Sequence, residues 1–372
     1  MAVYRIFPEQ DAFIFSEASG SNAGLDEILE VGGYTDISGQ GETSRILIQF
    51  SSTEIADIVT NKIGSNNYSA SLGLYLADAY QIPVDTTIFA YPVYSPIGWD
   101  NGSGKYGDVP VNDTGVSWAA RKYGGANAWP TVGLPAGVTY YTTGSKPGGG
   151  TWYTGSNGTN LEFTQSNPIN STYDVYMNVT DAVKLWNNGS ITNSGFILKL
   201  SSSLEFNTTS SIRLKYFGAD TNTIYPPYLE FKWDDTVYST GSLSVLNNSI
   251  ATVKVNNNRG EYANVGKQRF RVTAQPKYPV RTFTTSSIYL TNYALPSASY
   301  WGLRDENTEE MIIDFDTKFT KISCDSNGGY FDIYMDGLQP ERYYRILIQT
   351  TLDGSTTVID SDSNIIKVVR NG

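Results

Sequence analysis

Short runs of alternating apolar and polar residues recur along this chain, and they restrict its fold more than any other feature. In residues 44–50, Ile46, Ile48 and Phe50 alternate with polar or oppositely directed neighbours. Successive side chains of a strand point to opposite faces, so each run predicts a strand with one face to bury. Two sheets packed face to face bury such strands most economically, which predicts an all-β fold. The runs occupy residues 44–50, 69–77, 173–179, 195–200, 211–217 and 228–233, and then 268–274, 311–315, 330–336, 342–350 and 365–369.

The alternating pattern breaks near Asp234 and Asp235, and a second set of runs begins at about Val237. A chain of 372 residues suits two domains, each large enough to bury its own core. We therefore predict one β-sandwich domain over residues 1–236 and a second over residues 237–372.

Two short helices are expected to interrupt the strands of the first domain. Ser51 and Glu54 have the spacing of a capping box, and the helix that they open would end at Gly64. Thr180 is the expected N-cap of a second helix, which would stop at Gly189.

The charge and composition of the chain disfavour several classes of function. The formal net charge is −11 and no basic cluster is present, so we expect no nucleic-acid partner. The chain contains no histidine, which removes the usual general base and the commonest zinc ligand. We therefore predict no enzymatic activity and no cofactor.

The sequence also indicates where the protein is made and which ions it could hold. Cys324 is the single cysteine, so no intrachain disulfide is expected, and no signal peptide or membrane span is evident. These features favour folding in a reducing cytoplasm. Asp360–Asn364 imitates the start of a calcium loop but has Ile365 where glycine is required, and we interpret it as a solvated turn. A structural calcium ion held by other loop oxygens stays open, with metal ligands unknown.

A long segment between Pro96 and Asn170 is rich in Gly, Ser, Asn and Thr and carries several large aromatic residues. Long loops inside compact domains usually carry function or contacts. The rings could pin the loop onto the sandwich, or they could form an exposed platform for a sugar ring or a neighbouring subunit. The candidate ligand-binding residues are Trp99, Trp118, Trp129, Trp152 and Tyr153. The basic residues available there to an acidic glycan are Lys105, Arg121, Lys122 and Lys146.

A motif near the end of the chain places Leu338 and Pro340 six and four residues before Tyr344. The spacing resembles the tyrosine corner of fibronectin type III and immunoglobulin-like sandwiches, whose phenol bonds back to the preceding loop. The resemblance implies that Tyr344 faces inward while Tyr343 and Arg345 lie outside. It also implies an immunoglobulin or fibronectin III-like β-sandwich for the second domain.

An ordered series of landmarks in the first domain resembles the DNRLRE-type domain, a jelly roll similar to a class of alginate-binding carbohydrate-binding modules. The landmarks include Asp11-Ala12-Phe13-Ile14, Ser44-Arg45-Ile46-Leu47-Ile48-Gln49-Phe50 and Asn178-Val179-Thr180-Asp181. Arg45 matches the arginine of that family, whereas Gln49 stands where an acidic segment is often found. The resemblance implies a jelly-roll β-sandwich for residues 1–236.

Three further segments resemble a virion structural protein of contractile-tailed cyanobacterial phages. They are Tyr4-Arg5-Ile6-Phe7-Pro8-Glu9, Ile224-Tyr225-Pro226-Pro227-Tyr228-Leu229-Glu230-Phe231 and Gly337-Leu338-Gln339-Pro340-Glu341-Arg342-Tyr343-Tyr344. The resemblance implies a non-enzymatic component of the bacteriophage virion whose partners are other virion proteins and copies of itself. The alternative is a carbohydrate-binding adhesin that recognises host-surface polysaccharide.

Overall fold

The regular structure of this protein is almost entirely β. The computed structural model describes residues 2–80, 82, 85–123, 127–143, 145–169, 171–248, 250–256, 258–279 and 292–371. Strands account for 43% of it and helices for 8%, which confirms the predicted all-β class. Among the described residues, no helix is long and apolar enough to cross a membrane.

The chain divides into two compact units. The larger unit contains Ile6–Gly64 and Ser69–Glu230, and the smaller contains Met1–Arg5, Ser65–Tyr68 and Phe231–Gly372. The chain therefore passes between the units more than once, instead of crossing at a single linker.

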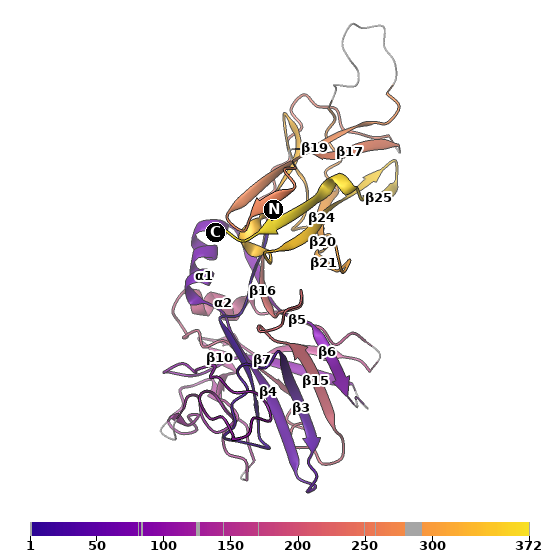
Figure 1. Ribbon diagram of the computed structural model, residues 1–372. Coiled ribbons are helices and arrows are strands. Elements are labelled where there is room, and N and C mark those ends of the chain that lie inside the picture. The colour runs from indigo at the N-terminus through magenta and orange to yellow at the C-terminus, as the bar shows by residue number, and fades with distance from the viewer. Residues whose placement is uncertain are drawn as a thin grey trace. The chain divides into compact units, whose positions relative to one another are not determined.

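The larger unit is built on an eight-stranded sheet with the order β12-β7-β14-β4-β3-β15-β6, in which β2 also pairs with β4. Figure 1 shows β3, β4, β6 and β15 as neighbouring arrows. Neighbouring strands of this sheet pair antiparallel, as hairpins and longer connections allow. The strands are β2 (Gln10–Phe15), β3 (Ile28–Thr35), β4 (Gly41–Gln49), β6 (Leu76–Tyr80), β7 (Thr86–Pro92), β12 (Phe163–Asn167), β14 (Phe196–Leu200) and β15 (Ile212–Phe217).

A four-stranded sheet has the order β1-β16-β5-β13, and short strand pairs decorate the long loops. Gly73 on β5 lies against the ring of Tyr228, and a β-carbon there would come within 2.1 Å of the ring. The strands are β1 (Ala2–Ile6), β5 (Tyr68–Leu74), β13 (Val175–Asn178) and β16 (Tyr228–Trp233), with β8 (Val138–Thr139) beside β9 (Trp152–Tyr153) and β10 (Gly155–Ser156) beside β11 (Thr159–Asn160).

Both expected helices form, but their N-terminal capping interactions differ from the prediction. The first consists of α1 (Ser52–Asp57) and a π-helical turn, η1 (Ile58–Ile63), which Gly64 ends. The Ser51 side chain makes no capping hydrogen bond, so the predicted capping box is absent. The second helix is α2 (Thr180–Asn187), and its N-cap is Val179 because the Thr180 hydroxyl bonds instead to Ala70 and Asn178.

The smaller unit contains two further sheets, with the orders β17-β19-β23-β22 and β18-β26-β24-β20-β21, and β25 also pairs with β24. The pairing of β18 with β26 is parallel. The elements are β17 (Ala251–Asn256), β18 (Glu261–Ala263), β19 (Lys267–Pro276), β20 (Ser299–Asp305), β21 (Met311–Ile313), β22 (Ser323–Asp325), β23 (Gly328–Tyr334), η4 (Met335–Gly337), β24 (Arg342–Leu352), β25 (Ser355–Ile359), η5 (Asp362–Asn364) and β26 (Ile365–Val369).

Aromatic rings from the two sheets of the smaller unit pack against one another. Phe270 and Phe331 belong to the first sheet, and their ring centroids are 5.7 Å apart. Trp301 of the second sheet stacks on Phe331 at 5.2 Å, and Tyr262 meets Phe270 edge-on at 5.5 Å. All four residues are buried. The contact between facing sheets makes this unit a β-sandwich.

The motif at 338–344 has the geometry of a tyrosine corner. Tyr344 is buried on β24, and its phenol donates a hydrogen bond of 2.9 Å to the carbonyl oxygen of Gln339. Leu338 is buried and Pro340 is half-buried, while Tyr343 is exposed and Arg345 is half-buried. The hydrogen bond joins the start of a central strand to the turn that precedes it.

Tyr344→Phe should lower the free energy of unfolding by about 1 kcal/mol, because it removes this hydrogen bond and keeps the ring. Tyr343→Phe is the matched control, since Tyr343 is the neighbouring tyrosine of the same strand and is 46% exposed. Urea unfolding of both variants measures the difference. Equal midpoints for Tyr344→Phe and Tyr343→Phe would contradict a stabilising corner.

A buried carboxyl group lies on β2 of the larger unit. Asp11 is 2% exposed, and its Oδ2 accepts a hydrogen bond of 2.6 Å from the backbone N–H of Ala219. Burial raises the pKa of Asp11 from 3.8 to about 7; the Ala219 hydrogen bond lowers it, and the nearby Asp220 raises it further. The folded protein therefore favours the neutral acid at a pH where the unfolded chain is already ionised.

Because the pKa of Asp11 is raised in the folded protein, the free energy of unfolding decreases as the pH rises. The contribution of Asp11 is fully present below pH 3.8 and is lost as the pH passes through about 7. Asp11→Asn keeps an acceptor for Ala219 and removes the ionisation, so its stability relative to wild type should increase from pH 4 to pH 8. The increase should be on the order of 3 kcal/mol. Thermal unfolding across this pH range measures it, with the exposed Asp113→Asn as control; parallel pH profiles for wild type and Asp11→Asn would refute the assignment.

Candidate functional site

The central strand β4 is buried on both faces, whereas its sequence pattern predicts one buried face. Ala12 on β2 and Ile197 on β14 each lie opposite Leu47 in register, so the three side chains share one face of the sheet. All three are completely buried. This second face is covered by the long segment that follows β7, which packs its own apolar side chains onto the strands.

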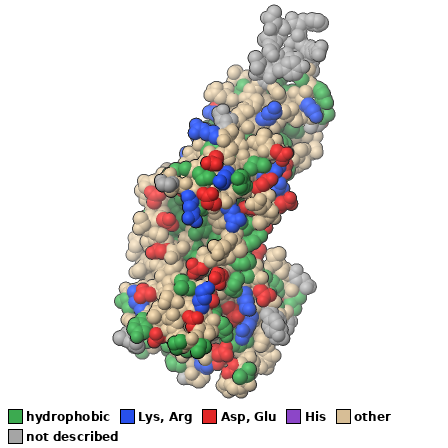
Figure 2. All heavy atoms as spheres, viewed as in Figure 1, with side chains coloured by type: hydrophobic (Ala, Val, Ile, Leu, Met, Phe, Trp, Pro, Cys, Tyr) green, Lys and Arg blue, Asp and Glu red, His purple; other side chains and the backbone are tan. Residues whose placement is uncertain are grey.

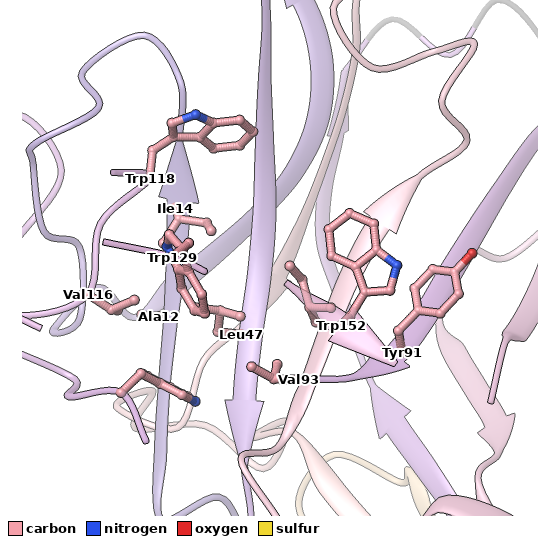
Figure 3. Close-up of a cluster of buried hydrophobic side chains, with 11 residues drawn as sticks. Ala12, Ile14, Leu47, Tyr91, Val93, Val116, Trp118, Trp129 and Trp152 are labelled. Carbon is pink, nitrogen blue, oxygen red and sulfur yellow. The ribbon is translucent and has the colours of Figure 1, made fainter. Parts of the chain in front are cut away.

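The four predicted tryptophans belong to this covering layer, and Figure 3 labels Trp118, Trp129 and Trp152. Their exposed fractions do not exceed 4%, and Trp118 has none. Three indole N–H groups donate to backbone carbonyls: Trp99 to Ser194 at 2.9 Å, Trp118 to Lys146 at 3.2 Å and Trp129 to Ser117 at 3.1 Å. Trp152 lies beside Tyr91, with ring centroids 5.7 Å apart.

These four tryptophan rings therefore pin the segment to the sheet, and none of them is exposed for a sugar to stack on. The reason is the second apolar face of β2, β4 and β14, which the rings cover. Tyr153 is half-buried and meets Tyr94 edge-on at 5.4 Å. Residues 124–126, 144 and 170 of the predicted loop lie outside the described part of the chain.

Arg45 on β4 also holds the long segment that follows β7 onto the sheet. Its guanidinium is fully buried and pairs with Glu205, with Nε–Oε1 and Nη2–Oε2 distances of 2.7 and 2.9 Å. It also donates to the carbonyl oxygens of Gly149 and Tyr141 on the segment. The carboxylate and two carbonyls thus satisfy a charge that would otherwise be costly to bury.

Aromatic and aliphatic groups surround this ion pair. The Arg45 guanidinium carbon lies 4.8 Å from the ring centre of Trp118 and 5.2 Å from that of Trp152. Lys199 adds a second cation, 2.9 Å from Glu205, and burial lowers its pKa despite that carboxylate. Two cations therefore share one buried carboxylate between aromatic rings, an arrangement that orders the loop.

Gly149 is required where the segment crosses Arg45. Its φ is +82°, a conformation that favours glycine, and a β-carbon would come 2.5 Å from the Trp118 ring and 2.8 Å from the Arg45 guanidinium. Gly148 and Gly150 also have positive φ values, of 118° and 95°. At the triple glycine, the backbone of the segment therefore passes close to buried side chains of the core.

The basic residues expected to serve an acidic glycan are mostly engaged with acids. Lys105 pairs with Glu27 and Lys122 with Asp100, each at 3.0 Å. Lys146 pairs with the buried Glu42, and the Arg121 guanidinium donates to the carbonyl of Asn127 at 3.4 Å. Acidic and basic side chains are likewise interspersed on the face drawn in Figure 2. These residues do not form a cationic surface.

The anchored segment nevertheless presents apolar side chains to solvent. Val109 and Val132 are 95% and 85% exposed, and Ile97, Val111 and Tyr123 are at least half exposed. Isolated exposed apolar residues are common, but here several occur on one segment whose backbone is fixed by a buried layer.

The C-terminal acidic turn has an internal partner in place of a metal. Asp360 and Asp362 both accept hydrogen bonds from Arg345, at 2.8 and 2.9 Å. Within the described ranges, no group of three or more His, Cys, Asp or Glu residues is arranged to hold a metal ion.

No protein-family model and no curated protein matches the chain.

Arg45→Met should lower the free energy of unfolding of the larger unit by about 3 kcal/mol, because it leaves buried acceptors without their donor. Lys122→Met breaks an ion pair of similar length at the surface and should cost at most about 1 kcal/mol. Hydrogen exchange of the amides at 141–152, together with urea unfolding, measures both effects. If Arg45→Met does not fold, Arg45→Lys tests the same contacts; amide protection equal to that of Lys122→Met would contradict the anchoring role.

Proposed function

We propose that this protein is a non-enzymatic structural component of a tailed-phage virion and assembles through protein–protein contacts. The proposal begins from the resemblance of three segments to a virion protein of contractile-tailed cyanobacterial phages. Its partners would be other virion proteins and copies of itself.

The exposed apolar side chains of the long segment that follows β7 are the observation that most favours an assembly role. Binding energy at protein interfaces comes from apolar and aromatic side chains that are already held in place, since little order must then be gained on association. Val111, Tyr123 and Val132 are exposed residues of this segment, and Val116, Trp118 and Trp129 of the same segment are buried in the layer on the sheet.

We further propose that the larger unit is a jelly roll and the smaller one an immunoglobulin or fibronectin III-like sandwich. The hydrogen bond from Tyr344 to Gln339 supports the second assignment, because that bond defines the tyrosine corner. Sandwiches of this kind suit a building block, since the sheets pair their own backbone while the loops vary freely.

If the proposal holds, the chain is present in purified phage particles at a fixed ratio to the other structural proteins. Mass spectrometry of dissociated particles measures this ratio. Absence of the chain from particles that are intact and infectious would reject the proposal.

Surface variants test whether the anchored segment makes the contacts. Val111→Ser combined with Val132→Ser should reduce incorporation into particles without changing the melting temperature of the isolated protein. The control pair is Val265→Ser with Val358→Ser, which makes the same change at half-exposed valines of the smaller unit. Equal incorporation of the two double variants into particles would show that the segment is not part of the interface.

A further inference from the structure

A half-open cavity of about 500 Å³ lies in the larger unit, away from the tryptophan layer. Phe13 lines it from β2, on the opposite face of that strand from Ala12 and Ile14. Small-molecule sites in proteins commonly enclose about 300–1,000 Å³, so the cavity is large enough for a compact ligand.

One wall of the cavity is aromatic. The ring centroid of Tyr106 lies 5.8 Å from that of Phe13 and 5.0 Å from that of Phe15. The two phenylalanines are buried, whereas Tyr106 is 51% exposed and can contact a ligand. The apolar wall therefore ends in a ring that is accessible from solvent.

The loop that carries Tyr106 is fixed to the residues just before β3. The Tyr106 N–H donates to Asp26 Oδ2 at 2.8 Å, and the Leu25 N–H donates to the Gly104 carbonyl at 3.0 Å. Lys105 pairs with Glu27 at 3.0 Å. Three contacts thus place the ring over the cavity before any ligand arrives, which lowers the entropy cost of binding.

The lining of the cavity also carries charges of both signs from three adjacent strands. Lys215 on β15 lies in register with Glu30 on β3 and with Asp78 on β6. Its Nζ is 4.0 Å from Asp78, and Arg213 is 3.7 Å from Glu30. Each cation therefore faces an acid across neighbouring strands, and both kinds of group reach the cavity.

This combination discriminates between classes of ligand. Two cations and the carboxylates of Asp26, Glu30 and Asp78 line the same space, so neither an anion nor a cation meets a wall of opposite sign alone. A hydroxyl group can donate to a carboxylate and accept from an ammonium or guanidinium group. A ring with apolar faces and several hydroxyls would satisfy the charged wall while it packs on Tyr106.

We propose that the cavity lined by Phe13, Tyr106, Glu30, Asp78, Arg213 and Lys215 binds one neutral sugar ring. The site is separate from the apolar residues assigned above to assembly, and the proposal goes beyond the structural role. A particle protein with such a site would also contact a glycan.

Saturation-transfer NMR on the full-length chain tests this site with defined probes. The neutral probes are the methyl pyranosides of glucose, galactose, mannose and N-acetylglucosamine; choline and glucuronate are the cationic and anionic probes. At least one neutral probe should bind more tightly than choline and glucuronate. Tyr106→Ala should weaken its binding at least about fivefold, through loss of the ring contact, and Asp78→Asn should weaken it through loss of an acceptor.

Tyr123→Ala is the matched control, because it removes another exposed tyrosine of the same long segment that does not line the cavity. Its affinity for the neutral probe should equal that of wild type. Tighter binding of choline or glucuronate, no binding of any neutral probe, or unchanged binding by Tyr106→Ala would each overturn the proposal. The isolated chain is used throughout, so the result is independent of whether the protein is found in particles.

Discussion

A guanidinium group with no exposed surface is the interaction on which the larger unit depends. Arg45 stands on the face of β4 that the long segment covers, and its charge must be neutralised before that face can be closed. Glu205 supplies the charge, while carbonyls of Gly149 and Tyr141 accept the remaining donors. The ion pair thereby links the sheet to residues about one hundred positions away, and the tryptophans exclude water around it.

The strands could be predicted from sequence because their signal is local. Alternation in residues 365–369 and 228–233 corresponds to β26 and β16, and the run at 342–350 lies within the longer β24. The tyrosine corner was equally accessible, because its geometry depends on residues within one turn of Tyr344. Helix positions followed from apolar spacing, and Ser51 is the N-cap of the first helix although its side chain makes no capping bond. The N-cap of the second helix is Val179, and the Thr180 hydroxyl bonds to Ala70 outside that helix.

The covering layer and the cavity could not be predicted, because both are made by residues distant in sequence. No residue close to Arg45 in the sequence indicates that Glu205 is its partner. A tryptophan in a glycine-rich segment gives the same sequence signal whether its ring faces a sheet or solvent. One signal was present: Arg45 shares a strand face with the apolar Leu47, and a charged residue at such a position needs a buried partner. The cavity combines Tyr106 with cross-strand neighbours such as Lys215 and Asp78, whose register is set only when β15 and β6 pair.

The division of the chain also determines an order of events during translation. Every segment of the larger unit has left the ribosome once residue 230 has emerged, so that unit can complete its core early. The smaller unit includes residues 2–5 together with the last third of the chain. Its first segment, in β1, must therefore wait until its pairing strand β16 has been synthesised, which happens only after more than half of the chain.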